Sequence, residues 1–227
     1  MAEQLTFDLP ARAATGRGDF FVSPANAVAV ATVEAWRDWP LGRLALTGPA
    51  GAGKTHLAHV WAAQAGARIV AARALAAADG AALAAAPVAV EDADRIARDD
   101  AAERALFHLV NRMGETRQPL LLTGTEAPAR WGIALPDLAS RLEAMPVAAI
   151  GGPDDALLAA VLVKQFSDRQ IAVAPDVIRY LVDRIPRSFA AARQVVDRLD
   201  RAALREGRAI TRRLAARLLD NGDAEGE

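Results

Sequence analysis

The sequence predicts an α/β domain built on a five-stranded parallel sheet, followed by a small all-helical domain. A complete G-x-x-x-x-G-K-T motif spans residues 48–55, between a short apolar segment and a helical pattern. Five short apolar segments alternate with helical patterns as far as residue 152, and only helical patterns follow. Because parallel sheets bind ligands at the carboxyl ends of their strands, we expect the functional site at that edge.

Composition and charge exclude several classes of function. The 227 residues are 52% hydrophobic and 24% charged, include no cysteine and carry a formal net charge of -1. Disulfides and thiol catalysis are therefore excluded, and bulk charge favours neither nucleic acid nor a membrane as partner. The first residues lack a basic and apolar leader, and charged residues interrupt every apolar run. We expect a cytoplasmic protein without a membrane partner.

The predicted organisation has four parts, divided where the composition changes. They are an N-terminal tail (1–17), an α/β domain (18–152), a helical domain (153–221) and a short acidic tail (222–227). Strands are expected at 43–47, 68–71, 87–92, 119–123 and 146–150. Helices are expected after the motif and at 25–36, 99–117, 136–142, 154–168, 175–184, 189–206 and 211–220. Ser23 is expected to cap the first helix, with Pro24 at its first position.

The glycine-rich motif has the chemistry of a phosphate-binding loop. Its glycines let backbone N–H groups converge on an anion, and the following helix adds the positive end of its dipole. Lys54 can reach the β- and γ-phosphates of a nucleotide, and the Thr55 hydroxyl can ligate Mg²⁺. The flanking strand and helix disfavour the alternative, a plain Gly/Ala-rich turn. The predicted nucleotide contacts here are Pro49, Ala50, Gly51, Ala52, Gly53, Lys54, Thr55 and His56.

Two further strands end in side chains that suit catalysis beside a phosphate loop. Glu91 and Asp92 close the third strand; one carboxylate can hold Mg²⁺, which we assign to Glu91 together with Thr55, and the other can orient an attacking water. Thr123 closes the fourth strand and can sense a γ-phosphate. The alternatives are acids that end a strand in solvent and an ordinary strand threonine.

Two segments upstream of the motif allow two interpretations each. The apolar cluster Phe20, Phe21 and Val22 can line an adenine pocket, although pattern alone favours core packing. In the tail, Leu5, Phe7 and Leu9 share one face of an extended chain and follow Gln4. Such a segment can dock in a pocket of a partner, or it can form an edge strand or pack on its own domain.

These landmarks together resemble the AAA+ ATPases, and within them the DnaA branch with its Hda-type regulatory inactivators of DnaA. The resemblance runs from the tail to about residue 220. Its motifs are G-K-T-H-L at 53–57, F-H-x-x-N at 107–111, L-x-S-R at 138–141, and D-F-F-V through Asn26, which resembles the segment that frames adenine.

The resemblance implies a regulator that binds ADP or ATP with Mg²⁺ and prevents re-initiation of DNA replication. It assigns Phe20, Phe21, Val22 and Asn26 to the nucleotide and Arg141 to the role of arginine finger. The tail is similar to a Q-L-x-L-x-L motif that binds the sliding clamp (the β subunit of DNA polymerase III), with Gln4, Leu5, Phe7 and Leu9 as anchors. The implied partners are DnaA and the clamp, and the resemblance is compatible with a homo-oligomer.

Departures from the initiator pattern sharpen these expectations. The chain stops after the helical lid, so sequence-specific DNA binding through a helix-turn-helix domain is not expected, and the connection at 71–87 is short. Glu91 stands where the initiator has Asp, which predicts weak intrinsic ATP hydrolysis. The lid arginine that senses nucleotide falls at Ala190; Arg187 or Arg193 can substitute, and Arg193 lies on the same helix face.

Two other functions remain open on the sequence. One is a AAA+ loader or adaptor acting on single-stranded DNA or a helicase, because the C-terminal helices carry many arginines. Aspartates and glutamates interleave with these arginines, which favours a solvated helix face instead. The other is a nucleotide-gated adaptor that hydrolyses nothing.

Overall fold

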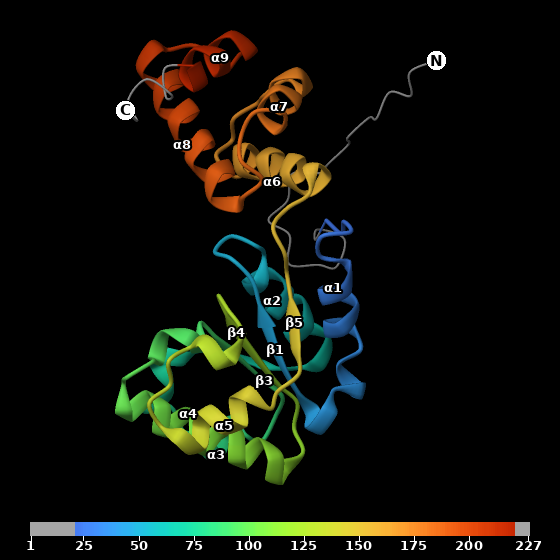
Figure 1. Cartoon of the computed structure of the whole chain (residues 1–227), viewed down its shortest axis with the longest axis vertical. Coiled ribbons are helices and arrows are strands. Elements are labelled where there is room, and N and C mark those ends of the chain that lie inside the picture. Colours follow the sequence, from blue (N-terminus) through green and yellow to red (C-terminus); the bar gives the residue numbers. More distant parts are fainter. Residues whose placement is uncertain (1–20, 221–227) are drawn as a thin grey trace.

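The computed structural model describes residues 21–220, which form a sheet domain and a helical lid (Figure 1). The predicted clamp anchors Gln4, Leu5, Phe7 and Leu9, the tail at 1–17, Phe20 and the acidic tail at 222–227 lie outside the described residues. The last strand leads directly into the first lid helix, so the lid stands beyond the carboxyl ends of the strands (Figure 1).

The sheet is parallel throughout, which confirms the predicted fold class. Its strands are β1 (Arg43–Thr47), β2 (Arg68–Ala71), β3 (Val88–Glu91), β4 (Leu120–Gly124) and β5 (Val147–Ala149). Their order is β2-β3-β4-β1-β5, and Ala45 of β1 pairs with Leu122 on one side and Val147 on the other. With β1 between β4 and β5, the glycine-rich loop that follows it lies beside the ends of β3 and β4.

Helices cover both faces of the sheet, and the alternation of strand side chains decides which face each residue joins. On one face, α1 (Ala27–Glu34) and α2 (Lys54–Ala65) pack on Leu46 and Leu121. On the other, Leu120 and Leu122 contact the layer of α4 (Asp100–Thr116). That layer also contains η4 (Ala72–Ala77), α3 (Gly80–Leu83), η5 (Ala93–Ile96), η6 (Pro128–Arg130) and α5 (Pro136–Glu143).

The first helix differs from its prediction. It ends at Glu34 and is followed by the short segments η2 (Trp36–Asp38) and η3 (Pro40–Gly42). Asn26, and not Ser23, occupies the N-cap position, so the predicted cap and the predicted place of Pro24 are both wrong. The Ser23 hydroxyl accepts instead from the N–H of Ala25, which forms a turn before the helix.

The lid consists of α6 (Asp155–Asp168), α7 (Pro175–Val182), α8 (Phe189–Glu206) and α9 (Arg212–Asp220). It has its own apolar core, which includes Leu158, Leu162, Val196 and Leu199. Within residues 21–220, none of the helices combines the length and apolar character needed to span a bilayer.

Candidate nucleotide-binding site

The phosphate loop lies between β1 and α2, as the motif predicts. Gly51 and Gly53 have φ angles of 86° and 88°, a region that suits glycine and turns the chain into the helix. Thr55 is exposed and His56 is half-buried in the first helical turn. All the predicted loop contacts lie together here: Pro49, Ala50, Gly51, Ala52, Gly53, Lys54, Thr55 and His56.

The Lys54 side chain is folded back across its own loop. It is 8% exposed, and its Nζ donates to the carbonyl oxygens of Gly48 at 2.7 Å and Pro49 at 3.1 Å. Burial lowers the pKa of Lys54 below its ordinary value, while the carboxylates of Asp94 and Asp92 act in the opposite direction. The loop thus holds a partly desolvated cation next to its own backbone.

The predicted acids and Thr123 meet beside this loop. Glu91 shares a sheet face with Ala89, which packs in the layer under α2, so its side chain lies on the phosphate-loop side of the sheet. Asp92 has a left-handed backbone, with φ of 55°, and its N–H donates to Thr123 Oγ1 at 3.0 Å. Its carboxylate is half-exposed and lies 3.3 Å from Nε of Arg95. Thr123 therefore positions the strand end that carries the acids.

A third acid, Asp94, belongs to the site and was not predicted. Its Oδ2 accepts from the N–H of Thr125 at 2.9 Å and from the Thr125 hydroxyl, which ties η5 to the end of β4. Its electrostatic effect on Lys54 is stronger than that of Asp92. In the sequence, only the spacing E-D-x-D at 91–94 indicates a role for Asp94. The 3-10 turn η5 directs its side chain toward the loop.

The donor set fits a magnesium nucleotide. Within the described residues, Glu91 Oε1 and Asp94 Oδ1 are buried and have no hydrogen-bond partner, so each is an acceptor available to a cation or its water. No three acidic or histidine side chains in residues 21–220 cluster to hold a metal by themselves. Mg²⁺ in nucleotide sites typically takes one or two protein ligands and otherwise phosphates and waters, which Thr55 and Glu91 would satisfy.

The lid brings one arginine to the phosphate loop. A Cβ atom placed on Gly51 would lie 3.3 Å from Nη2 of Arg193, so this guanidinium lies against the loop. Arg187 is committed elsewhere, because its Nε and Nη2 donate to the carboxylate of Asp155 at 2.7 Å and 3.0 Å. Arg193 therefore lies against the phosphate loop, whereas Arg187 is bound to Asp155.

The segment before α1 is ordered by its own backbone contacts. The Asn26 side chain accepts from the N–H of Ser23 and donates to the carbonyl oxygen of Phe21, both at 2.9 Å, so its polar atoms shape this segment. Phe21 is 38% exposed and Val22 is 52% exposed, which contradicts core packing for these two. Val22 borders a hollow of about 330 Å³ lined mainly by α1 and α2.

Arg141 lies away from this site. Its guanidinium lies over the ring of Phe107, with Cζ 5.4 Å from the ring centroid. It is also near Arg43, the first residue of β1, where it adds to the larger effect of burial in lowering the pKa of that guanidinium. Because the phosphate loop follows the opposite end of β1, about 15 Å along the strand, Arg141 is remote from its own loop.

Comparisons with known proteins agree with this architecture. Residues 154–216 match the family model of the Hda lid domain. Domain III of Thermotoga maritima DnaA superposes with a TM-score of 0.71 at 16% identity, covering 94% of this chain and 98% of that one. DnaA bound to AMPPCP and single-stranded DNA gives a TM-score of 0.65 at 17% identity, covering 87% and 69%. AMPPCP-bound DnaA from Aquifex aeolicus gives 0.64 at 16% identity, covering 84% and 66%.

The two findings concern different parts of the chain. The structural likeness covers the sheet domain and the lid and shows their fold, while the family match covers the lid alone. This chain spans about two thirds of the longer DnaA chains that it resembles. Residues 154–216 are thus similar to the Hda lid domain, and the sheet domain together with its lid has the fold of DnaA domain III.

Proposed function

We propose that this protein is an adenine-nucleotide-binding regulator of replication initiation, which docks on the sliding clamp and stimulates hydrolysis of ATP bound to DnaA. The observation that carries the proposal is the match of the lid, residues 154–216, to the Hda lid domain. A lid of this type joined to a DnaA-like sheet domain favours a protein that interacts with DnaA.

In this proposal, the protein's own site holds ADP or ATP between the sheet domain and the lid. Lys54 and Thr55 hold the phosphates and Mg²⁺, with Glu91 as a further ligand, and Arg193 contacts the phosphates from α8. Mg²⁺ neutralises phosphate charge when it is bound. Because Arg193 comes from the lid and Lys54 from the sheet domain, a nucleotide there would hold the two parts together.

Arg141 acts on the ATP of DnaA. Its exposure, and its position at the opposite end of β1 from the protein's own loop, support a role at a site on another molecule. An arginine supplied in this way stabilises the charge on the phosphoryl group in the transition state and contributes roughly 10³–10⁵ in rate. The same geometry is compatible with contacts between copies of this chain.

The N-terminal tail provides the tether. Gln4, Leu5, Phe7 and Leu9 are the anchors of an extended clamp-binding peptide, and tethering on the clamp raises the local concentration of the regulator near replicated DNA. Weak contacts between Arg141 and DnaA then suffice.

The test follows the conversion of ATP–DnaA to ADP–DnaA in the presence of clamp loaded on DNA. The intact chain is expected to accelerate conversion, and the double variant Gln4→Ala, Leu5→Ala is expected to lose both clamp binding in a pull-down and acceleration. The matched control is Thr6→Ala, Asp8→Ala, on the face of an extended tail opposite to Leu5, Phe7 and Leu9, which should behave as the intact chain. Failure of the intact chain to bind the clamp, together with salt-sensitive binding to single-stranded DNA, would instead favour a loader.

A further inference from the structure

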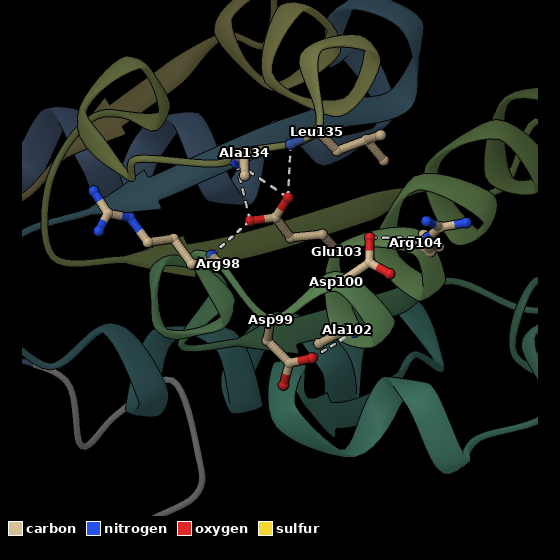
Figure 2. Close-up of polar contacts among 8 residues, drawn as sticks. All are labelled: Arg98, Asp99, Asp100, Ala102, Glu103, Arg104, Ala134 and Leu135. Atoms are coloured by element: carbon tan, nitrogen blue, oxygen red, sulfur yellow. Dashed lines mark hydrogen bonds and ion pairs between the residues drawn. The ribbon is translucent and has the colours of Figure 1, made fainter.

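Glu103 connects two loop segments by hydrogen bonds to their backbone: the segment at Arg98 and the segment at Ala134 and Leu135. It lies in the first turn of α4, its side chain is 2% exposed, and its carboxylate accepts four hydrogen bonds (Figure 2). Oε1 accepts from the N–H of Arg98 at 2.7 Å and of Ala134 at 3.0 Å. Oε2 accepts from the N–H of Ala134 at 3.1 Å and of Leu135 at 2.7 Å. In the described part of the chain, every one of these hydrogen-bond donors is a backbone N–H group.

One of the two segments begins the helix that carries Arg141. Leu135 is the N-cap residue of α5 and has no side chain able to cap it, so Glu103 fixes the start of α5 from a neighbouring helix. Phe107, which lies under the Arg141 guanidinium, is four residues after Glu103 on the same helix face. Helix α4 therefore contacts α5 at its start and again at its arginine.

The other segment leads back to the acidic end of β3. Arg98 has a left-handed backbone, with φ of 67°, and follows η5, which itself begins directly after Asp92. Asp94 within η5 is tied to the end of β4. The carboxylate of Glu103 thus joins the segment that follows η5 to the start of α5, the helix that carries Arg141 (Figure 2).

We propose that Glu103 is the positioning residue for Arg141, because it fixes the start of α5 against the turn that leaves the acidic strand end. The inference rests on the proposed function of Arg141 at the ATP of DnaA. Glu103 touches neither nucleotide nor DnaA; it sets the place of the helix that presents the guanidinium. An ionised carboxylate suits this role because it accepts from several N–H groups at once and lies at the N-terminal end of α4.

The test compares Glu103→Gln with the intact chain. The glutamine NH₂ group cannot accept, so at least one of the backbone N–H groups loses its partner while side-chain volume is kept. The measured quantities are the maximal rate of hydrolysis of DnaA-bound ATP, the concentration of regulator that gives half of it, and the affinity for ADP. We expect the maximal rate to fall roughly tenfold or more, because misplacement of a catalytic group lowers rate steeply. The half-saturating concentration and the ADP affinity should stay within about twofold, since separate residues provide them.

Two controls separate positioning from folding. Asp100→Asn changes an exposed acid in the same turn of α4 and should leave the maximal rate unchanged. If Glu103→Gln does not fold, Glu103→Asp replaces it; its carboxylate is one methylene too short to reach both segments and should lower the maximal rate in the same way. A loss that saturating regulator restores would indicate only partial unfolding and would overturn the proposal, as would an unchanged maximal rate.

Amide hydrogen exchange distinguishes a failure of this inference from a failure of the proposed function. In Glu103→Gln, exchange should rise at Arg98 or Leu135, whichever N–H faces the amide NH₂ group, and along α5, while Leu121 and Leu122 in the sheet stay protected. If the intact chain does not stimulate DnaA, the proposed function fails, and raised exchange confined to α5 and its start would still support Glu103 as its positioning residue. Unchanged exchange at both Arg98 and Leu135 would overturn it.

Discussion

At the scale of single residues, the phosphate loop depends on a close approach between the two domains. Gly51 has no side chain, and a Cβ atom there would lie 3.2 Å from Cβ of Phe189 and 3.3 Å from Nη2 of Arg193. Phe189 packs in the same apolar layer as Leu57 of α2, so the lid rests on the loop through close contacts that a methyl group on Gly51 would force apart by a few tenths of an ångström.

We predict that Gly51→Ala disturbs both the fold and the nucleotide site. An alanine at the positive φ of this position lowers the free energy of unfolding by about 1 kcal/mol. Displacement of Arg193 by its methyl group lowers ADP affinity by about tenfold. Gly66→Ala is the matched control, because Gly66 also has a positive φ but open space around it. Chemical denaturation and calorimetric titration with ADP measure the two effects. Equal ADP affinity in both variants would contradict the contact between lid and loop.

We predict that Arg193→Ala and Arg187→Ala differ in nucleotide binding. Loss of a charge-assisted contact to phosphate costs about 1.5–3 kcal/mol, so Arg193→Ala should weaken ADP binding roughly 10- to 150-fold. Arg187 forms an exposed ion pair with Asp155, whose loss should change stability little and leave ADP affinity unchanged. Isothermal titration with Mg²⁺–ADP measures both. A larger loss of ADP affinity in the Arg187 variant than in the Arg193 variant would contradict the assignment of Arg193 as the lid arginine that contacts nucleotide.

At the scale of elements, Asp154 joins the first lid helix to the segment before α1. Its Oδ1 accepts from the N–H of Leu157 at 2.8 Å and caps α6, and its Oδ2 accepts from the N–H of Ala25 at 3.3 Å. The hydrogen bond from Leu157 is the main cause that lowers the pKa of Asp154, which burial partly opposes and the contacts with Ser23 and Ala25 reinforce.

We predict that Asp154→Ala lowers the free energy of unfolding by about 1 kcal/mol at neutral pH, because an N-cap is lost. A depressed folded-state pKa means that this stabilisation is fully present above the ordinary pKa of aspartate and is lost as the pH falls through the folded-state value. The gap between variant and parent should therefore close in acid. Urea denaturation from neutral pH into acid tests this, with Asp176→Ala, a first-turn acid that is not a cap, as control. A gap independent of pH would refute the role of the charge.

The sequence predicts the elements and the phosphate loop because their determinants are local. Strand alternation and a motif of fixed spacing place Lys54 and Glu91 without knowledge of the rest of the chain. The sequence predicts a start of the first helix that is too early, because Ser23 suits the N-cap position as well as Asn26 does, and only the folded segment shows which of them occupies it. Asp94 depends on a 3-10 turn, which no hydrophobic period reveals.

Local sequence patterns do not predict contacts between segments that are distant in the chain. Glu103 reads as an ordinary acid in a charged first turn, and nothing local distinguishes it from Asp100. Its role follows from α4 lying against a segment some 30 residues later in the chain. The choice of Arg193 over Arg187 likewise depends on how the lid is seated on the loop.

At the scale of the whole molecule, the two functional groups are separated by the sheet. The phosphate loop follows the carboxyl end of β1, and Arg141 lies near its first residue, Arg43. A rigid parallel sheet between them keeps the arginine from reaching its own nucleotide site. The arrangement is suited to a protein whose nucleotide site and arginine serve different molecules, and this is the physical basis of the proposed regulation.

The most direct test of this account is a single-turnover measurement of hydrolysis of labelled ATP bound to DnaA, with clamp on DNA and saturating regulator. We predict that the intact chain accelerates hydrolysis and that Arg141→Ala abolishes the acceleration, a loss of roughly 10³-fold or more where the assay resolves it. Arg104→Ala, which removes an exposed arginine of α4, should retain full acceleration. Full acceleration by Arg141→Ala, in a protein that still binds ADP and the clamp, would contradict the central claim that Arg141 completes the active site of DnaA.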